Sequence, residues 1–242
     1  MNIIGVDCAT QDKNVGVALG RLTSTHLEVL DVYDPHRSGS VLEYLVKSYV
    51  LGEPTLLALD APLGWPAELG PALVRHTAGD HIAITANKLF RRRTDACIKE
   101  KLDRQSLDVG ADRIARTAHS ALKLLNDLAE RLSRRIPLAW NPQIAGIAAI
   151  EVYPAATLAA YDIPARAYKP ADAVSKRKTI LDQLQKLLVL QCSADCLSRD
   201  ADALDAVVCV LAAADFLRGD AHPPDDPDLA VKEGWIWSRL RT

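Results

Sequence analysis

Two apolar segments in the first quarter of the chain end in an aspartate, and they constrain the fold more than any other feature. Residues 3–7 read Ile-Ile-Gly-Val-Asp and end at Asp7, and residues 55–60 read Thr-Leu-Leu-Ala-Leu-Asp and end at Asp60. Short apolar runs bounded by turn residues are typical of buried strands. A carboxylate at the end of such a strand is costly unless it is paired with a cation or holds a metal ion. The two segments therefore predict neighbouring strands that end at a charged site.

The segments around this pair predict the order of the sheet. Apolar and β-branched runs predict three strands before residue 34, over Asn2–Cys8, Asn14–Leu19 and His26–Tyr33. The short gaps between them favour antiparallel hairpins. The next segment has a helical period that begins at Val41, and Ser40 and Glu43 have the spacing of a capping box. Strand–strand–strand–helix–strand predicts three antiparallel strands and then a crossover to a parallel one.

The rest of the chain predicts an insertion, a fifth strand and further helices. Residues from about 61 to 110 are rich in proline and glycine and are too long for a simple loop, so we expect them to cover the carboxyl edge of the sheet. Periodicity predicts helices over Asp112–Arg135, Ser175–Leu190 and Asp200–Leu217, and a strand over Ile144–Tyr153. We therefore expect one α/β domain over residues 1–242, with a mixed five-stranded sheet flanked by helices and a tail from about 219 to 242.

Composition limits the classes of function. The 242 residues are 49% hydrophobic and 25% charged, which is enough for a core, and no apolar run reaches the length of a membrane span. The start of the chain lacks the pattern of a signal peptide, and the five cysteines have no disulfide-framework spacing. These features predict a cytoplasmic protein. The net charge of −2 argues against a protein that coats nucleic acid non-specifically.

Further acidic residues are expected to join Asp7 and Asp60. Glu151 ends the fifth expected strand, and Asp202 and Asp205 are three residues apart on one face of the last expected helix. Converging carboxylates repel one another, and a divalent cation removes that repulsion, so the pattern predicts a Mg²⁺ site. Each acid also has a structural alternative. The strand-end aspartates suit turns, Asp200 or Asp202 suits a helix N-cap, and Glu151 suits a solvated strand end. Asp205 lies past the first helical turn and fits a cap less well.

Basic residues supply candidates for phosphate binding. Arg92 and Arg93 lie in a run of three arginines and could grip phosphate, with Asp95 orienting one of them. A solvated loop is the alternative for such a run. Lys169 and the run of residues 176–178 are weaker candidates, which the pattern assigns to the exposed start of a helix.

Six short motifs occur in an order that resembles a known family. They are Gly5-Val6-Asp7, Asp60-Ala61-Pro62, Arg92-Arg93-Thr94-Asp95, Glu151-Val152-Tyr153-Pro154, Asp202-Ala203-Leu204-Asp205-Ala206 and Glu233-Gly234-Trp235-Ile236. Their order resembles the ribonuclease H-like fold, and the Asp-x-x-Asp-Ala helix is similar to that of Holliday junction resolvases. Together, from residue 2 to about 237, they resemble a bacterial and archaeal family described as a domain of unknown function and as predicted RNase H-like nucleases.

The resemblance implies a metal-dependent nuclease, in which Asp7 bridges two Mg²⁺ or Mn²⁺ ions. Asp60 and one or both of Asp202 and Asp205 would complete the ligands, and Glu151 would be a further ligand or a base that orients water. The ions would activate water for phosphodiester hydrolysis. DNA or RNA is then the expected partner, and a homodimer is an open alternative to a monomer. Two other functions stay open: hydrolysis of a nucleotide-like small phosphate compound, and a binding or regulatory role without catalysis.

Overall fold

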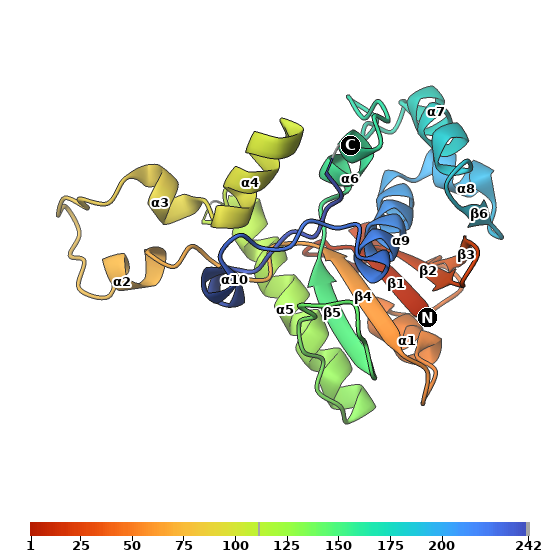
Figure 1. Ribbon diagram of the computed structural model, residues 1–242, viewed down its shortest axis with the longest axis horizontal. Helices are drawn as coiled ribbons and strands as arrows, with labels where there is room; N and C mark the ends of the chain where they lie inside the picture. Colours follow the sequence, from red (N-terminus) through yellow and green to blue (C-terminus); the bar gives the residue numbers. More distant parts are fainter. Residues whose placement is uncertain (111, 241–242) are drawn as a thin grey trace.

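The computed structural model describes residues 1–110 and 112–240, and a mixed six-stranded sheet forms its centre (Figure 1). The strands are β1 (Asn2–Asp7), β2 (Gly16–Leu22), β3 (Leu27–Val32), β4 (Thr55–Asp60), β5 (Ile147–Glu151) and β6 (Val189–Leu190), in the spatial order β5-β4-β1-β2-β3-β6. The first three are antiparallel neighbours, and β4 and β5 continue the sheet as parallel strands. The predicted mixed sheet, antiparallel and then parallel, is confirmed.

The predicted count of five strands is wrong, because a short sixth strand adds to the edge of the sheet. The expected helix over Ser175–Leu190 ends early, as α7 (Val174–Leu184), and β6 follows it and pairs parallel to β3. Residues 187–190 read Leu-Leu-Val-Leu, an apolar run with neither a helical nor a strand period. Residues 189–190 adopt a strand conformation because they pair with β3, which would otherwise be the open edge of the sheet.

Two layers of helices cover the sheet, one on each face (Figure 1). Helix α9 (Ala201–Arg218) packs across β1, β2 and β4, with α6 (Pro154–Ala160), α7 and α8 (Ala194–Arg199) on the same side. Helices α1 (Val41–Ser48) and α5 (Asp112–Leu132) cover the other face. Alternate residues of each strand enter the two cores; Ile3 packs against the α9 side and Ile4 against the α1 side. No described helix is both long and apolar enough to cross a membrane.

The insertion between β4 and β5 extends to one side of the sheet. It contains α2 (Leu69–Leu73), α3 (Ala86–Phe90) and α4 (Arg93–Leu102), and the segment with α2 and α3 projects to the left in Figure 1. A 3₁₀ turn (Asp12–Asn14) follows β1, and α10 (Pro227–Glu233) lies in the tail. The tail returns to the sheet, where the Trp237 N–H donates to the Glu151 carbonyl oxygen at 2.9 Å. Residues 241–242 of the expected tail lie outside the described residues.

Three glycines allow α9 to approach the sheet closely. A Cβ atom at Gly5 would overlap the carbonyl oxygen of Ala206, and one at Gly16 would overlap that of Asp202. A Cβ at Gly20 would meet the side chain of Val210. Because these glycines lie on β1 and β2, the axis of α9 lies closer to the strands than a larger residue would permit. This approach brings the first turns of α9 to the end of β1, where Asp7 lies.

Replacement of Gly5 tests this close contact. We expect Gly5→Ala to lower the free energy of unfolding by about 1–3 kcal/mol, because the added methyl group meets backbone atoms that cannot move without shifting α9. Gly146→Ala is the matched control, since a Cβ there has no neighbour within 4 Å. Urea denaturation of both variants measures the difference. Equal stability of the two variants would show that α9 has room to move.

Candidate metal centre

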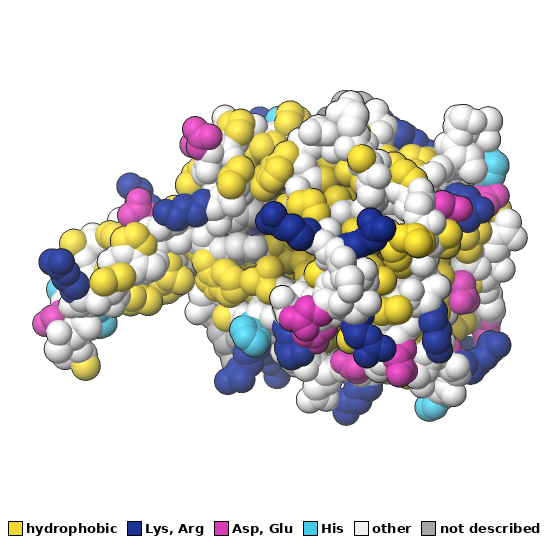
Figure 2. All heavy atoms as spheres, turned by 90° about the horizontal axis from the view of Figure 1, so that it is seen from below, with side chains coloured by type: hydrophobic (Ala, Val, Ile, Leu, Met, Phe, Trp, Pro, Cys, Tyr) yellow, Lys and Arg dark blue, Asp and Glu magenta, His cyan; other side chains and the backbone are white. Residues whose placement is uncertain are grey.

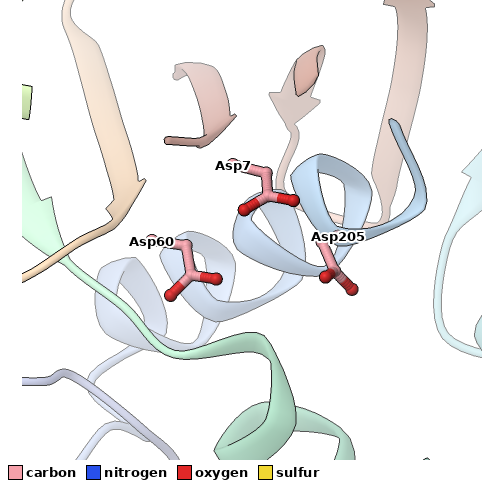
Figure 3. Close-up of side chains that lie close together, drawn as sticks. All are labelled: Asp7, Asp60 and Asp205. Carbon is pink, nitrogen blue, oxygen red and sulfur yellow. The ribbon is translucent and has the colours of Figure 1, made fainter. Parts of the chain in front are cut away.

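Three aspartates from three different elements converge at the carboxyl ends of β1 and β4. Asp7 ends β1, Asp60 ends β4, and Asp205 lies on α9 (Figure 3). One carboxylate oxygen from each lies within 4.8 Å of the others. Asp7 is 7% exposed and Asp205 is fully buried, whereas Asp60 is partly exposed. We call these three residues the triad.

The local structure explains why the triad forms. Parallel pairing places Asp7 directly opposite Asp60 in the register of β1 and β4. On α9, the N-cap is Asp200, whose carboxylate accepts hydrogen bonds from the N–H groups of Asp202 and Ala203. Asp205 therefore lies past the first turn and points into the protein. Of the two residues expected as alternative N-caps, Asp200 is confirmed and Asp202 is wrong; Asp202 is half-buried in the first turn and outside the triad.

The carboxylates of the triad resist ionisation in the absence of a metal ion. Burial is the largest cause that raises the pKa of Asp60 to about 7; the charge of Asp205 contributes to the rise, and Lys169 opposes it. Burial also raises the pKa of Asp7 well above its ordinary value, with Asp60 as the next cause. Burial likewise raises the pKa of Asp205, against the opposing effects of Lys169 and Tyr168. A bound divalent cation would reverse these shifts, because it stabilises the ionised form.

Lys169 supplies the positive charge nearest to the triad among the described residues. Its ammonium group forms an ion pair with Asp205 Oδ2 and lies 3.7 Å from Asp7 Oδ2. The neighbouring Tyr168 hydroxyl donates a hydrogen bond of 2.6 Å to Asp205 Oδ1. The sequence ranked Lys169 as a weak candidate at the exposed start of a helix. That placement is wrong, because Lys169 lies in the loop before α7 and contacts the triad.

Arg177 fixes the loop that carries these two residues. Its guanidinium group is fully buried and donates hydrogen bonds to the carbonyl oxygens of Tyr168, Pro170, Ala171 and Ser198. The run of residues 176–178 was expected to be exposed, which is wrong for its central arginine. Four carbonyl acceptors from two segments hold the loop against α7 and α8. No sequence motif signals this role, because the acceptors are backbone atoms.

Glu151 and Arg92 form a buried ion pair beside the triad. Arg92 Nη2 lies 2.7 Å from Glu151 Oε1, Nη1 lies 2.8 Å from Oε2, and the Leu63 N–H donates to Oε2 at 2.9 Å. Burial is the largest influence on the pKa of Glu151 and raises it, while Arg92 opposes the rise. The alternative of a solvated glutamate is wrong, since Glu151 is 4% exposed. Its role as a metal ligand or base stays a prediction, although both oxygens already accept hydrogen bonds.

The two candidate phosphate-binding arginines occupy different environments. All five N–H groups of Arg92 donate within the protein, to Asp95, Glu151 and the Glu233 carbonyl oxygen. Phosphate binding by Arg92 would require this network to break. Arg93 is exposed and pairs with Asp225. It is not among the described residues that line the cavity next to the triad.

The donor set of the triad suits a hard divalent cation. Asp205 Oδ2 is buried and accepts no well-aligned hydrogen bond from the described residues, so its only close partner is the Lys169 ammonium group. Carboxylate oxygens are the ligands that Mg²⁺, Mn²⁺ and Ca²⁺ prefer. The triad therefore could bind a metal ion, and the chemistry of its ligands favours these ions over soft ones.

Comparison with known proteins places the chain in a family without assigning it an activity. A family model described as "Protein of unknown function (DUF429)" matches residues 5–229. The matched range contains all three triad residues and Lys169. No curated protein and no solved structure gives a significant match.

Adjacent arginines allow the buried ion pair to be tested against an exposed one. We expect Arg92→Met to lower the free energy of unfolding by about 3–5 kcal/mol, because it leaves the buried Glu151 and Asp95 without their cation. Arg93→Met is the control and should cost less than about 1 kcal/mol, since its ion pair with Asp225 is exposed. Urea denaturation at neutral pH compares the variants. Similar losses in both would contradict a special role for the Arg92 network.

The pH dependence of stability tests the raised pKa values. The folded metal-free protein keeps protons on the triad at pH values at which the unfolded chain has released them. This contribution to stability is fully present below about pH 4. It is lost as the pH rises through the folded-state pKa values, which reach about 7 at Asp60.

In the presence of chelator, wild type should lose more unfolding free energy between about pH 5 and about pH 8 than Asp60→Asn does. We expect a difference on the order of 1–2 kcal/mol, because the partial exposure of Asp60 reduces the effect. Urea denaturation at the two pH values measures it. Identical pH profiles for the two proteins would contradict the raised pKa of Asp60.

Proposed function

The chain belongs to the family described as "Protein of unknown function (DUF429)", and we propose that it is a divalent-metal-dependent phosphodiesterase that hydrolyses nucleic acid. The observation that carries the proposal is the triad, with its buried Asp205 oxygen that lacks a well-aligned hydrogen bond. The proposal includes a ribonuclease H-like fold. Three antiparallel strands followed by parallel ones, with acids at the ends of β1 and β4 and on a late helix, support that assignment.

In this proposal Asp7, Asp60 and Asp205 hold Mg²⁺ or Mn²⁺. A bound metal ion would lower the pKa of a water molecule and would stabilise the negative charge that develops on the phosphate. The protein supplies the geometry: the Tyr168 hydroxyl donates to Asp205 Oδ1, which leaves Oδ2 paired with the Lys169 ammonium group alone among the described residues. Burial of Asp7 and Asp205 excludes water from their inner sides, so the carboxylates act as acceptors at a fixed position.

Lys169 has two roles in this proposal, first as a counter-ion of the triad and then as a contact for the substrate phosphate. Its ammonium group neutralises part of the charge of Asp7 and Asp205 in the metal-free protein. The side chain is 53% exposed and flexible, so it can leave the carboxylates when a divalent cation binds. From the same loop, the ammonium group can then contact a substrate phosphate in the adjoining cavity, whose wall it already forms.

The proposal also covers the cellular compartment, the oligomeric state and a second candidate substrate. The five cysteines are free thiols, which supports the expected reducing cytoplasm. A homodimer follows from the likeness to resolvases alone and stays a prediction. Hydrolysis of a nucleotide-like small phosphate compound is the second candidate function, because the net charge of −2 and the small cavity next to the triad favour a small substrate over a long duplex.

Conservative replacement of triad residues tests the proposed metal site. We expect Asp7→Asn and Asp205→Asn to abolish saturable binding of Mn²⁺. Metal-dependent hydrolysis should fall on the order of 10²–10³-fold, the loss seen when an enzyme loses one preorganised group that stabilises charge in the transition state. Their stability in chelator should be equal or higher, because carboxylate repulsion is relieved. Asp202→Asn is the matched control, from the same helix but outside the triad.

Calorimetric titration into the millimolar range and a panel of single-stranded, hybrid and branched substrates provide the two measurements. Mn²⁺ binding that persists in Asp7→Asn would overturn the site. A loss of stability in chelator would instead assign the triad a structural role. Equal losses of hydrolysis in Asp202→Asn and Asp205→Asn would show that Asp202 contributes to metal binding as much as Asp205 does.

A further inference from the structure

We propose that the cavity next to the triad binds one nucleoside phosphate unit, either a free nucleotide or the end of a single strand. This inference rests on the proposed function and specifies its substrate. The cavity has a volume of about 280 Å³, at the lower end of the range for small-molecule sites. A site of this size holds one nucleotide unit and does not admit a double helix. The strand would have to present its phosphate on an end or on an unpaired nucleotide.

The polar groups of the cavity gather at the triad. Asp7, Asp60 and Lys169 all line it, and Lys169 contacts the triad directly. Arg92 and Glu151 also reach the wall, but their side chains are already bonded to each other. Among the described residues that line the cavity, Lys169 is therefore the cation whose partners are the triad itself, so its ammonium group can turn from the carboxylates to a phosphate. A phosphate placed there would meet Lys169 and any metal ion held by the triad, two positive charges that suit a phosphoryl group.

Much of the remaining wall is apolar and comes from the parts of the chain outside the central sheet. Leu107 lies in the insertion, Ile114 on α5, Tyr153 after β5 and Ile236 in the tail. Leu107 is 68% exposed, so its side chain is accessible to a ligand in the cavity. An aromatic and aliphatic wall suits the flat face of a nucleobase, since stacking and apolar contact do not depend on which base is present.

The few hydroxyl groups in this wall are already engaged. Ser106 donates to Asp95 at 2.9 Å, and Thr117 donates to the Arg113 carbonyl oxygen at 3.0 Å. Base recognition by hydrogen bonds would need donors and acceptors that face the cavity. The wall thus favours a nucleoside over a bare phosphate but has little means to select one base.

The fold holds this wall in a fixed relation to the triad. Asp95 binds both Arg92 and Ser106, and the Thr94 hydroxyl accepts the Ile236 N–H at 2.8 Å. The insertion and the tail are thus joined to β5 through the Arg92 network. On the face of the molecule shown in Figure 2, basic and acidic side chains are interspersed and form no extended patch of a single sign. A duplex needs a broad basic surface, whereas one nucleotide needs only the local cation.

Binding measurements with small probes test this inference. Adenosine 5′-monophosphate and inorganic phosphate would be titrated calorimetrically, in metal-free buffer and at millimolar Mg²⁺. We expect the nucleotide to bind at least tenfold more tightly than inorganic phosphate, since only the nucleotide contacts the apolar wall. Lys169→Met should weaken both ligands about tenfold. Ile114→Trp, which fills the half-buried wall position, should reduce nucleotide affinity to that of phosphate without changing phosphate affinity.

Leu122→Trp is the matched control, because Leu122 lies on the same helix but does not line this cavity. It should change neither affinity. Displacement of the nucleotide by a short single strand, but not by the corresponding blunt duplex, would show that the cavity binds the end of a single strand. Displacement by neither would identify free nucleotides.

Equal affinities for nucleotide and phosphate in wild type would overturn the inference, and so would displacement of the nucleotide by the blunt duplex as readily as by the single strand. Failure of the proposed function looks different. In that case nucleotide selectivity persists in metal-free buffer, while Mn²⁺ binding and hydrolysis are absent. Normal Mn²⁺ binding without nucleotide selectivity would overturn only the inference about the cavity.

Discussion

The burial and convergence of the three triad carboxylates, of which Asp60 alone is partly exposed, is the constraint on which the rest of this structure depends. Register between β1 and β4 places Asp7 opposite Asp60, and the glycines of β1 and β2 let α9 bring Asp205 to the same point. Burial raises the pKa of all three groups, and repulsion by a neighbouring carboxylate of the triad raises it further at Asp7 and Asp60. An ordinary core would replace these acids by apolar residues, because buried charges seldom stabilise a fold. Their presence on three rigid elements is what a site for a cation requires.

Neighbouring carboxylates at the same edge of the sheet serve different purposes because their partners differ. Glu151 ends β5, one strand away from Asp60, but Arg92 meets both of its oxygens and Leu63 donates a further hydrogen bond. Arginine suits such a site, since its planar fork matches a carboxylate and stays charged when buried. The ion pair joins the insertion to the sheet. The triad instead has a flexible lysine as its counter-ion, and this difference separates a structural ion pair from an exchangeable one.

The sequence predicted the features that depend on local pattern and missed those that depend on tertiary contacts. The aspartates at the ends of β1 and β4 and the position of Asp205 past the first turn of α9 follow from strand length and helical period. Residues 189–190 form a strand because they pair with the edge of β3, and the local sequence pattern gives no sign of that contact. Arg177 and Lys169 were misplaced for a related reason. Their partners are backbone carbonyl oxygens and residues distant in the chain, so charge and spacing alone could not reveal them.

The two basic residues of the loop region show how one segment can be fixed and yet hold an exchangeable charge. Arg177 holds the backbone of residues 168–171 through carbonyl oxygens, so the position of the loop does not depend on the ionisation of the triad. Tyr168 restrains one oxygen of Asp205, whereas the Lys169 side chain is half-exposed and is held at its end by the ion pair with the triad. The ammonium group can therefore leave the carboxylates without unfolding the loop that carries it. A loop held by the triad itself would lose its anchor whenever a metal ion bound.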